Sequence, residues 1–446
     1  MVDDETARLF DAAQKLIETA KRYGADAADA AVVRSHARAA QVRLGVVEEI
    51  EASESEDLTL RVFVDGRVAT VSAPPGVEVE RIVERAVAMA RVSPRDPYAG
   101  LSEPSMLASG ELDLDLFDDT DVTSEELARH ALALEDAART VPGVRNSGGA
   151  SASVGFSGLV LVTSNGFSGA RRRSGFSRSV SVIAGEGTAM QRDYDYDSRV
   201  HFADLEEPEA IGRRAGERAV KRLDPRSVAT GTMPVVYDPR VSRSLVGHLV
   251  SASLGSSIAR GTSFLKDRMG AEILPAGVSI TDEPLLPRRQ ASRSFDGEGV
   301  RGTSLSLVEN GVLSNWLLDG ATARELGLAA NGRAARSGSG VSPSASNVVM
   351  NAGPQTPEAL IGETGRGIYV TELIGHGANL VTGDYSRGAS GFMIEDGELT
   401  YPVSELTIAG NLSEMFLSLS AADDLDPRHT IVAPTLRVGA MTVAGR

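Results

Sequence analysis

Alternating apolar residues broken by two-residue turns are the feature that most restricts the fold of this chain. Four apolar residues occupy every second position ahead of Asp65-Gly66: Leu58, Leu60, Val62 and Val64. Apolar residues resume over 68–71, and a similar arrangement surrounds Asn165-Gly166, between runs at 154–162 and 180–183. A period of two is typical of a β-strand, and Asp-Gly and Asn-Gly are favoured two-residue hairpin turns. The sequence therefore predicts at least two β-hairpins.

Helical periodicity separates these hairpins. Apolar residues recur at helical spacing over 9–20, 82–90 and 127–138, and residues 206–223 are also predicted to form a helix. Thr123 and Glu126 have the spacing of a capping box at the start of the third helix. The N-terminal part of the chain should therefore mix helices with sheet.

The length of 446 residues suggests two or three domains. We place the main boundary at Asp224-Pro225, which gives an N-terminal α+β region (1–225) with a sub-boundary near 102–122, and a β-rich C-terminal domain (226–446). Closely spaced turn signals such as Asn310-Gly311 and Asp396-Gly397 predict short strands in the second part, interrupted by one helix near 241–258. The predicted fold class is α+β.

Charge and composition exclude several classes of protein. The formal net charge of −16 argues against a nucleic-acid-binding protein, because Lys and Arg supply most of the affinity for phosphates. The only basic run, 171–173, is interpreted as a solvated turn. The chain has no cysteine, which excludes disulfides, zinc–thiolate sites and cysteine nucleophiles. No two of the six histidines lie within ten residues, so no local histidine metal motif exists.

Two acidic segments resemble calcium sites without fitting them. Residues 111–126 contain many carboxylates and no Lys or Arg, but lack the turn glycine and ligand register of an EF-hand, so a solvated linker is the preferred interpretation. Asp193, Asp195 and Asp197 alternate with two tyrosines, which predicts a half-exposed strand.

Common catalytic and targeting motifs are also missing. The sequence contains no GxxxxGK[ST], GxSxG or HExxH. It shows neither a secretory signal nor an apolar stretch of about 20 residues, so we expect a cytoplasmic protein without membrane segments.

Several segments together resemble one known family. TGDYSRGASGF at 382–392, IEDGE at 394–398 and YPVSELTIAGNL at 401–412 closely resemble the C-terminal signature of the TldD/PmbA family, and within it the PmbA branch, also called TldE. Shorter matches occur at 96–101, 191–194, 295–299 and 439–445. The resemblance covers nearly the full length.

This resemblance implies a pair of subunits that form a bacterial zinc metallopeptidase. In the family, TldD carries the zinc and TldE is its partner; the pair processes ribosomally made peptides and degrades unfolded small proteins, and an older name is modulator of DNA gyrase. TldD-like members bind zinc through HExxxH on a helix and a cysteine near the C-terminus. On the corresponding helix this chain has Arg243, Ser244 and His248, and the segment expected to carry the cysteine is shortened to 425–430.

These replacements predict that the chain holds no zinc and has no catalytic residue of its own. Arg243 would place a permanently charged guanidinium where a ligand should donate a lone pair. Residues five apart also lie 140° apart around an ideal helix, so the family site needs a widened turn or a third ligand. His248 is expected to be a packing histidine, and zinc is expected in the partner subunit.

The signature segment suggests where substrate would bind. We hypothesise that Asp384, Tyr385, Ser386 and Arg387 line a cavity shared with the partner, where Asp384 and Arg387 hold the peptide by charge-assisted hydrogen bonds. The alternative is a structural turn with a local Asp384–Arg387 pair.

The leading interpretation is a non-catalytic subunit of a heterodimeric TldD/TldE peptidase, with a TldD-like subunit and a peptide or unfolded protein as partners. The alternative is a homodimeric regulatory or binding protein, like a gyrase modulator, without a peptidase role. A third interpretation is an independent hydrolase with an unconventional site, because catalytic triads are assembled in space rather than in sequence.

Overall fold

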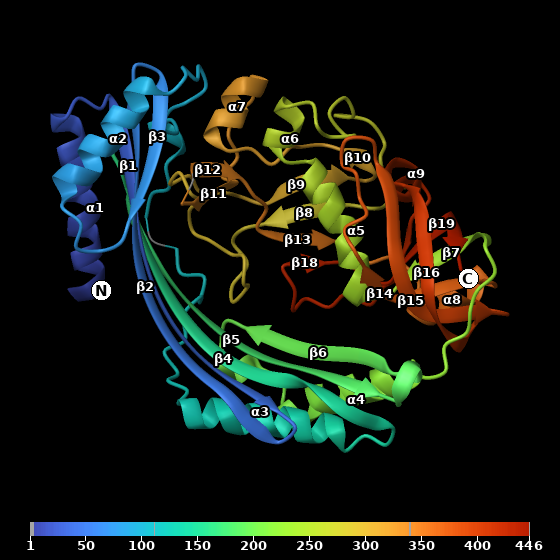
Figure 1. The fold of residues 1–446 in the computed structure, drawn as a ribbon. Helices are drawn as coiled ribbons and strands as arrows, with labels where there is room; N and C mark the ends of the chain where they lie inside the picture. Colours follow the sequence, from blue (N-terminus) through green and yellow to red (C-terminus); the bar gives the residue numbers. More distant parts are fainter. Residues whose placement is uncertain (1–3, 111, 339, 446) are drawn as a thin grey trace.

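The N-terminal half of the chain forms one long, curved antiparallel sheet (Figure 1). The computed structural model describes residues 4–110, 112–338 and 340–445; Glu111, at the start of the predicted acidic linker, lies outside them. Six strands pair in the order β3-β2-β1-β4-β5-β6. Their bounds are β1 Ala27–Arg43, β2 Val46–Val64, β3 Arg67–Ala73, β4 Val144–Thr163, β5 Ser168–Ala184 and β6 Gln191–Arg199. Both predicted hairpins are present, as β2–β3 and β4–β5.

Helices cover the convex face of this sheet in two pairs (Figure 1). The pairs are α1 (Asp4–Arg22) with α2 (Val79–Val92), and α3 (Ser124–Arg139) with α4 (Pro208–Lys221). Each pair buries its apolar stripe against the sheet and forms its own core. The capping box is confirmed: the Glu126 amide donates to Thr123 Oγ1 at 3.2 Å, and the Thr123 amide donates to Glu126 Oε2 at 2.9 Å.

The C-terminal half contains two further sheets and a hairpin. One sheet has the order β10-β9-β8-β13-β18, and the other β16-β15-β14-β7-β19-β17. Because β16 also pairs with β19, five strands of the second sheet close into a ring. The bounds are β7 Gly231–Tyr237, β8 Ile280–Glu283, β9 Leu305–Glu309, β10 Val312–Leu313, β11 Ala334–Ser337, β12 Gly340–Pro343, β13 Asn347–Met350, β14 Gly367–Ile374, β15 Asp384–Glu395, β16 Glu398–Asn411, β17 Ser420–Ala421, β18 Ile431–Val432 and β19 Leu436–Ala444.

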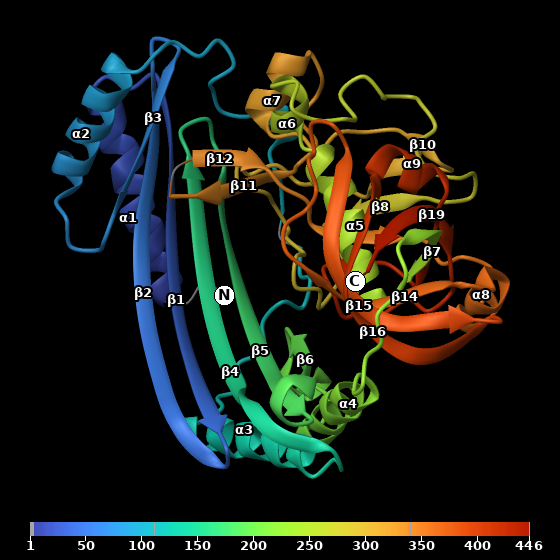
Figure 2. The same cartoon turned by 45° about the vertical axis from the view of Figure 1, so that its right-hand side comes forward.

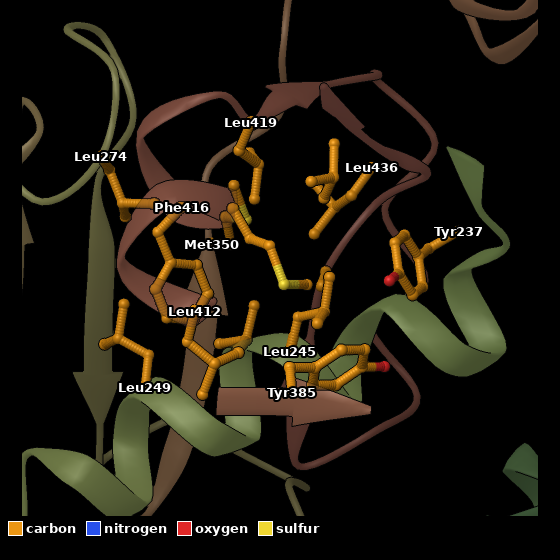
Figure 3. Packing of buried hydrophobic residues seen from close by; sticks show 14 of the residues in the cluster. Tyr237, Leu245, Leu249, Leu274, Met350, Tyr385, Leu412, Phe416, Leu419 and Leu436 are labelled. Carbon is orange, nitrogen blue, oxygen red and sulfur yellow. The ribbon is translucent and has the colours of Figure 1, made fainter. Parts of the chain in front are cut away.

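Helix α5 (Pro239–Ala252) lies between these two sheets and contributes to the largest core (Figure 1). Leu245 and Leu249 of α5 point into this core together with Leu412 and Phe416 (Figure 3). The remaining helices are α6 Gly255–Ala259, α7 Gly320–Leu326, α8 Pro357–Thr364 and α9 Leu412–Leu417, with 3₁₀ turns at Pro104–Met106, Gly187–Ala189 and Phe202–Asp204.

The helix expected over 241–258 is in fact two helices. The chain leaves helical geometry at Ser253 and Leu254, where the Gly255 amide donates to Leu317 O and the Leu317 amide donates to Ser253 O. Tertiary backbone pairing therefore replaces the helical hydrogen bonds that local spacing predicts.

The basic run at 171–173 is not a turn, and that prediction was wrong. All three arginines lie within β5, where side chains alternate between the two faces of the sheet. The strand predicted from the alternating aspartates is present as β6, and it buries the aspartates while Tyr194 stays 37% exposed. Arginines explain this inverted pattern, because Asp195 accepts hydrogen bonds from Arg214 and Arg218 at 2.7 and 2.9 Å.

The C-terminal domain lies in the concave side of the long sheet (Figure 2). Buried ion pairs join the two halves: Arg222, at the end of α4, contacts Asp193 at 3.4 Å and also pairs with Glu372 of β14. The α+β fold class is confirmed, with four helices and a six-stranded sheet in the described N-terminal half and a mainly β C-terminal half that includes the long strands β15 and β16. Within the described ranges, no helix is long and apolar enough to cross a membrane.

Candidate functional site on helix α5

Helix α5 starts where β7 ends and carries Arg243, Ser244 and His248, the three residues that the sequence comparison placed at the positions of HExxxH. Asp238 caps it by accepting the Arg240 amide at 2.9 Å, and Pro239 occupies the first turn, where its missing N–H costs nothing. The other Asp238 oxygen accepts the Tyr369 hydroxyl at 2.9 Å, which ties the helix start to β14. Strand and cap therefore fix the direction of the helix.

One side of α5 opens on a cavity of about 390 Å³. Arg243, Ser244 and Gly247 form the helical wall. The other walls come from β6, from Gln290 and from the segment 428–431, which includes the end of the shortened segment at 425–430. The altered helix positions and the shortened segment thus meet at one place in space, although almost 200 residues separate them in sequence.

The walls of this cavity carry several guanidinium groups. Arg240 donates to Asp193 Oδ1 at 2.9 Å, and Arg428 pairs with Asp426 at 2.6 Å. Arg243 has no ion pair within the described part of the chain; its Nε donates to Arg240 O at 3.0 Å, and its guanidinium lies 5.8 Å from the centre of the Tyr196 ring. Burial opposes ionisation of Asp426, but hydrogen bonds from His429 and Arg428 lower its pKa overall. Asp426 is therefore a carboxylate that balances Arg428, whereas the charge of Arg243 has no such counterpart among the described residues.

His248 faces away from this cavity. Its ring meets the Tyr385 ring edge-on, with centroids 6.0 Å apart, and its buried Nε2 has no hydrogen-bond partner in the structure. Burial, followed by the nearby positive charge of Arg387, lowers the pKa of His248, and burial raises the pKa of Tyr385 to about 12. A neutral imidazole therefore lies beside a neutral phenol.

These residues do not fit a zinc ion. Helix α5 is regular, so Arg243 and His248 point in directions about 140° apart. The Ser244 hydroxyl donates to Val241 O at 2.7 Å, inside the helix. Across the described residues, no three His, Asp or Glu side chains are grouped so that they could hold a metal ion.

The four residues proposed to bind substrate do not form one set. They begin strand β15, where Asp384 and Ser386 are exposed on one face, while Tyr385 is buried and Arg387 half-buried on the other. Asp384 accepts the Thr382 hydroxyl at 2.6 Å, and Arg387 Nε donates to Ile374 O at 3.3 Å. The local Asp384–Arg387 pair of the alternative prediction is not formed. Tyr385 and Arg387 are the two that face the His248 side of α5.

The glycines of the same signature have packing roles. A Cβ added to Gly391 would lie 1.9 Å from Tyr369 O, so only glycine permits the close approach of β14 and β15. Gly383 has a φ of 82°, in the left-handed region that favours glycine.

Sequence reasoning missed most of the α5 cavity wall. Tyr196, Gln290 and Arg428 come from three separate segments whose spacing gives no sign that they meet. The only available signal was the alternation in β6, which places Tyr196 opposite the buried aspartates.

Comparison with known proteins agrees with this architecture. The chain matches three models of the PmbA/TldA metallopeptidase family: domain 1 at residues 28–90, the central domain at 117–223 and the C-terminal domain at 230–445. Metalloprotease PmbA of Escherichia coli O157:H7 is 35% identical over 94% of this chain and 93% of that protein. The chain belongs to the PmbA/TldD family.

Other members of the PmbA/TldD family support the same assignment. A PmbA homologue of Haemophilus influenzae is 33% identical over 96% of this chain and 94% of that protein. A Bacteroides thetaiotaomicron structure, described there as a modulator of DNA gyrase, superposes with a TM-score of 0.91 at 28% identity and covers both chains completely. TldE of Thermococcus kodakarensis shares the fold, with a TM-score of 0.86 at 22% identity over 97% of this chain and 99% of the other.

Proposed function

We propose that this chain is the non-catalytic, TldE-type subunit of a heterodimeric TldD/TldE zinc metallopeptidase that processes or degrades peptides. The observation that carries the proposal is the state of helix α5. At the positions of HExxxH stand Arg243, without an ion pair to the described residues, Ser244, bonded within the helix, and His248, turned toward Tyr385. A peptidase of this family needs zinc with an open position for water. We therefore assign the zinc to a TldD-like partner.

The role of this chain in the pair would be to hold the substrate. Its cavity beside α5 offers guanidinium groups, and strand β15 presents the side chains of Asp384 and Ser386 at its surface. Both features suit an extended peptide, whose main chain and carboxylates need hydrogen-bond partners of this kind. We place this function in the cytoplasm. The chain has no cysteine, so its stability does not depend on disulfides, which the reducing cytoplasm would not maintain.

Co-expression with the TldD-like protein of the same genome tests the proposal. The co-purified pair is expected to cleave an unfolded protein or peptide, and each chain alone is expected to be inactive. The matched control is a pair whose partner carries Gln in place of the HExxxH glutamate, which removes the general base and should abolish cleavage. Cleavage by this chain alone, or by the control pair, would overturn the assignment.

The second candidate is a homodimeric regulatory protein without a peptidase role. It is favoured by the similarity to the Bacteroides protein described as a modulator of DNA gyrase. This candidate predicts a stable symmetric dimer that does not exchange subunits with a TldD-like chain. Light scattering of the isolated chain, before and after addition of that partner, separates the two candidates.

A further inference from the structure

Three arginines from distant segments line a second cavity, of about 420 Å³, between the long sheet and the C-terminal domain. Arg171 and Arg173 come from β5, and Arg293 comes from the segment that precedes Phe295. Arg172 lies between the first two in sequence and also lines the cavity, but it is exposed, and its guanidinium lies 3.8 Å from the centre of the Phe117 ring. The strand thus directs two positive charges toward a third across the domain boundary.

None of these three arginines forms an ion pair with the described residues; all of their hydrogen bonds go to main-chain carbonyls. Arg171 donates to Phe295 O at 3.2 Å, Arg173 to Gln290 O and Ser292 O, and Arg293 to Ser344 O at 3.0 Å. The Arg293 Nε is buried and has no hydrogen-bond partner in the structure. Donor capacity therefore remains unused at this cavity.

The neighbouring carboxylates of Asp296 and Asp282 form their hydrogen bonds and ion pairs with other groups. Asp296 accepts the amides of Glu298, Val300 and Ala334 at 2.8–2.9 Å. Asp282 pairs with Arg333 at 2.6 Å.

The three positive charges repel one another, and the negative charge of the nearby Asp296 offsets only part of the effect at Arg171 and Arg293. Burial, then the charges of Arg173 and Arg293, lowers the pKa of Arg171 to about 10. Burial also lowers the pKa of Arg293. Half-buried cations that are grouped without an ion-pair partner are costly, and an anion in the cavity would reduce that cost.

We propose that the cavity of Arg171, Arg173 and Arg293 is a binding site for a carboxylate group of a peptide. Planar guanidinium groups match a carboxylate with paired hydrogen bonds, and more than one is available here. That the carboxylate belongs to a peptide rests on the proposed function. Gln290 lines both this cavity and the cavity beside α5, so the two cavities are neighbours.

The edge of β5 beside these arginines is only partly covered by the segment around Leu116, whose carbonyl accepts the Ser174 amide at 3.1 Å. Strand β6 pairs with β5 only from Phe176 onward, so the part of β5 that carries Arg171 and Arg173 continues beyond the end of β6. An extended chain lying there would place acidic side chains, or its own C-terminus, beside the arginines. The site would therefore favour acidic substrates or a free peptide end.

Fluorescence anisotropy with three labelled octapeptides tests the proposal on the purified full-length chain. The first alternates Glu and Ala and has an amidated C-terminus, the second has Gln in place of Glu, and the third is the Gln peptide with a free C-terminal carboxylate. We expect the amidated Gln peptide to bind at least tenfold more weakly than one or both of the others. The first peptide reports side-chain carboxylates and the third reports the terminus. Equal binding of all three peptides, or no binding of any of them, would overturn the proposal.

Substitutions locate the binding to this cavity. Arg293→Gln is expected to weaken binding of the preferred peptide at least tenfold and to leave the melting temperature unchanged or raised, because mutual repulsion is relieved. Arg293→Lys keeps the positive charge but loses the paired N–H donors of the guanidinium. This variant should fold normally, and its affinity for the peptide should lie between those of the wild type and Arg293→Gln. Arg213→Gln, on the exposed surface of α4, is the matched control and should bind normally. Undiminished binding by Arg293→Gln and Arg293→Lys would contradict the proposal, as would a fall in melting temperature with normal binding.

The outcome can be separated from that of the proposed function, because the binding test needs no partner and no cleavage. Binding of carboxylate peptides together with an inactive co-purified pair would overturn only the peptidase assignment. Cleavage by the pair together with no carboxylate preference would overturn only the site.

Discussion

At His248, burial and the adjacent positive charge of Arg387 both favour the neutral imidazole. Its pKa in the folded protein is therefore below the value of about 6.5 expected in the unfolded chain. Because the unfolded chain binds the proton more readily, the stabilising contribution is present above that unfolded value and is lost as the pH falls through the folded value.

We predict that His248→Phe flattens the pH dependence of stability below neutrality. Phenylalanine keeps the edge-on contact with Tyr385 and removes the titrating group. Urea unfolding at pH 7.5 and pH 5.5 should show a smaller loss of unfolding free energy for the variant than for the wild type. His376→Phe, at an exposed position, should retain the wild-type difference. Identical losses in His248→Phe and wild type would show that His248 is not the group responsible.

Single residues also show how far the sequence could predict the site. Arg243, Ser244 and His248 were identified correctly as lying on one helix, because an aligned helix keeps its spacing. The direction of each side chain on that helix follows from 100° per residue. The position of Arg171 and Arg173 at a cavity was missed, because alternation along β5 says nothing about which domain lies opposite them.

At the scale of elements, local sequence signals predicted the start of helix α3 and two hairpin turns better than they predicted the end of helix α5. The capping box of α3 and both hairpin turns are fixed by neighbours within four residues, and they were predicted correctly. The end of α5 depends on pairing with Leu317, more than 60 residues away, so no local pattern could show it. Buried aspartates in β6 likewise depend on arginines of another element.

We predict that Thr123→Ala destabilises the protein by about 1 kcal/mol, the usual cost of removing an N-cap side chain. The variant loses the Thr123 Oγ1 acceptor for the Glu126 amide and, with it, half of the capping box. Chemical denaturation measures the change. Ser124→Ala, the adjacent hydroxyl outside the cap, is the control and should stay within about 0.5 kcal/mol of wild type. Equal effects of the two substitutions would refute the role of the cap.

At the scale of the whole molecule, buried ion pairs hold the C-terminal domain against the long sheet. Arg222 reaches from the end of α4 to Asp193 at 3.4 Å and to Glu372 of β14, and its side chain is only 7% exposed. Sequence reasoning placed a domain boundary just after this arginine but gave no sign of the contact across it. Such contacts join residues far apart in the chain, so only the assembled fold reveals them.

We predict that Arg222→Met destabilises the protein by about 2 kcal/mol, because Asp193 and Glu372 each lose one of their two arginine partners. Weaker contact between the C-terminal domain and the long sheet should also expose the segment between α4 and β7. Limited proteolysis is therefore expected to cut this segment faster in the variant. Arg213→Met, on the exposed face of the same helix, should change neither measurement. If Arg222→Met is as stable as the wild type, the contact between the C-terminal domain and the long sheet does not depend on the ion pairs of Arg222.

The central claim is that this chain cannot build a zinc site on α5, and the metal content of the isolated protein tests it most directly. The purified chain is saturated with zinc, passed over a desalting column, and its metal measured by mass spectrometry beside a TldD-like chain treated in the same way. We predict far less than one zinc per molecule of this chain and about one in the TldD-like chain. One tightly held zinc per molecule that is lost in His248→Phe would contradict the account.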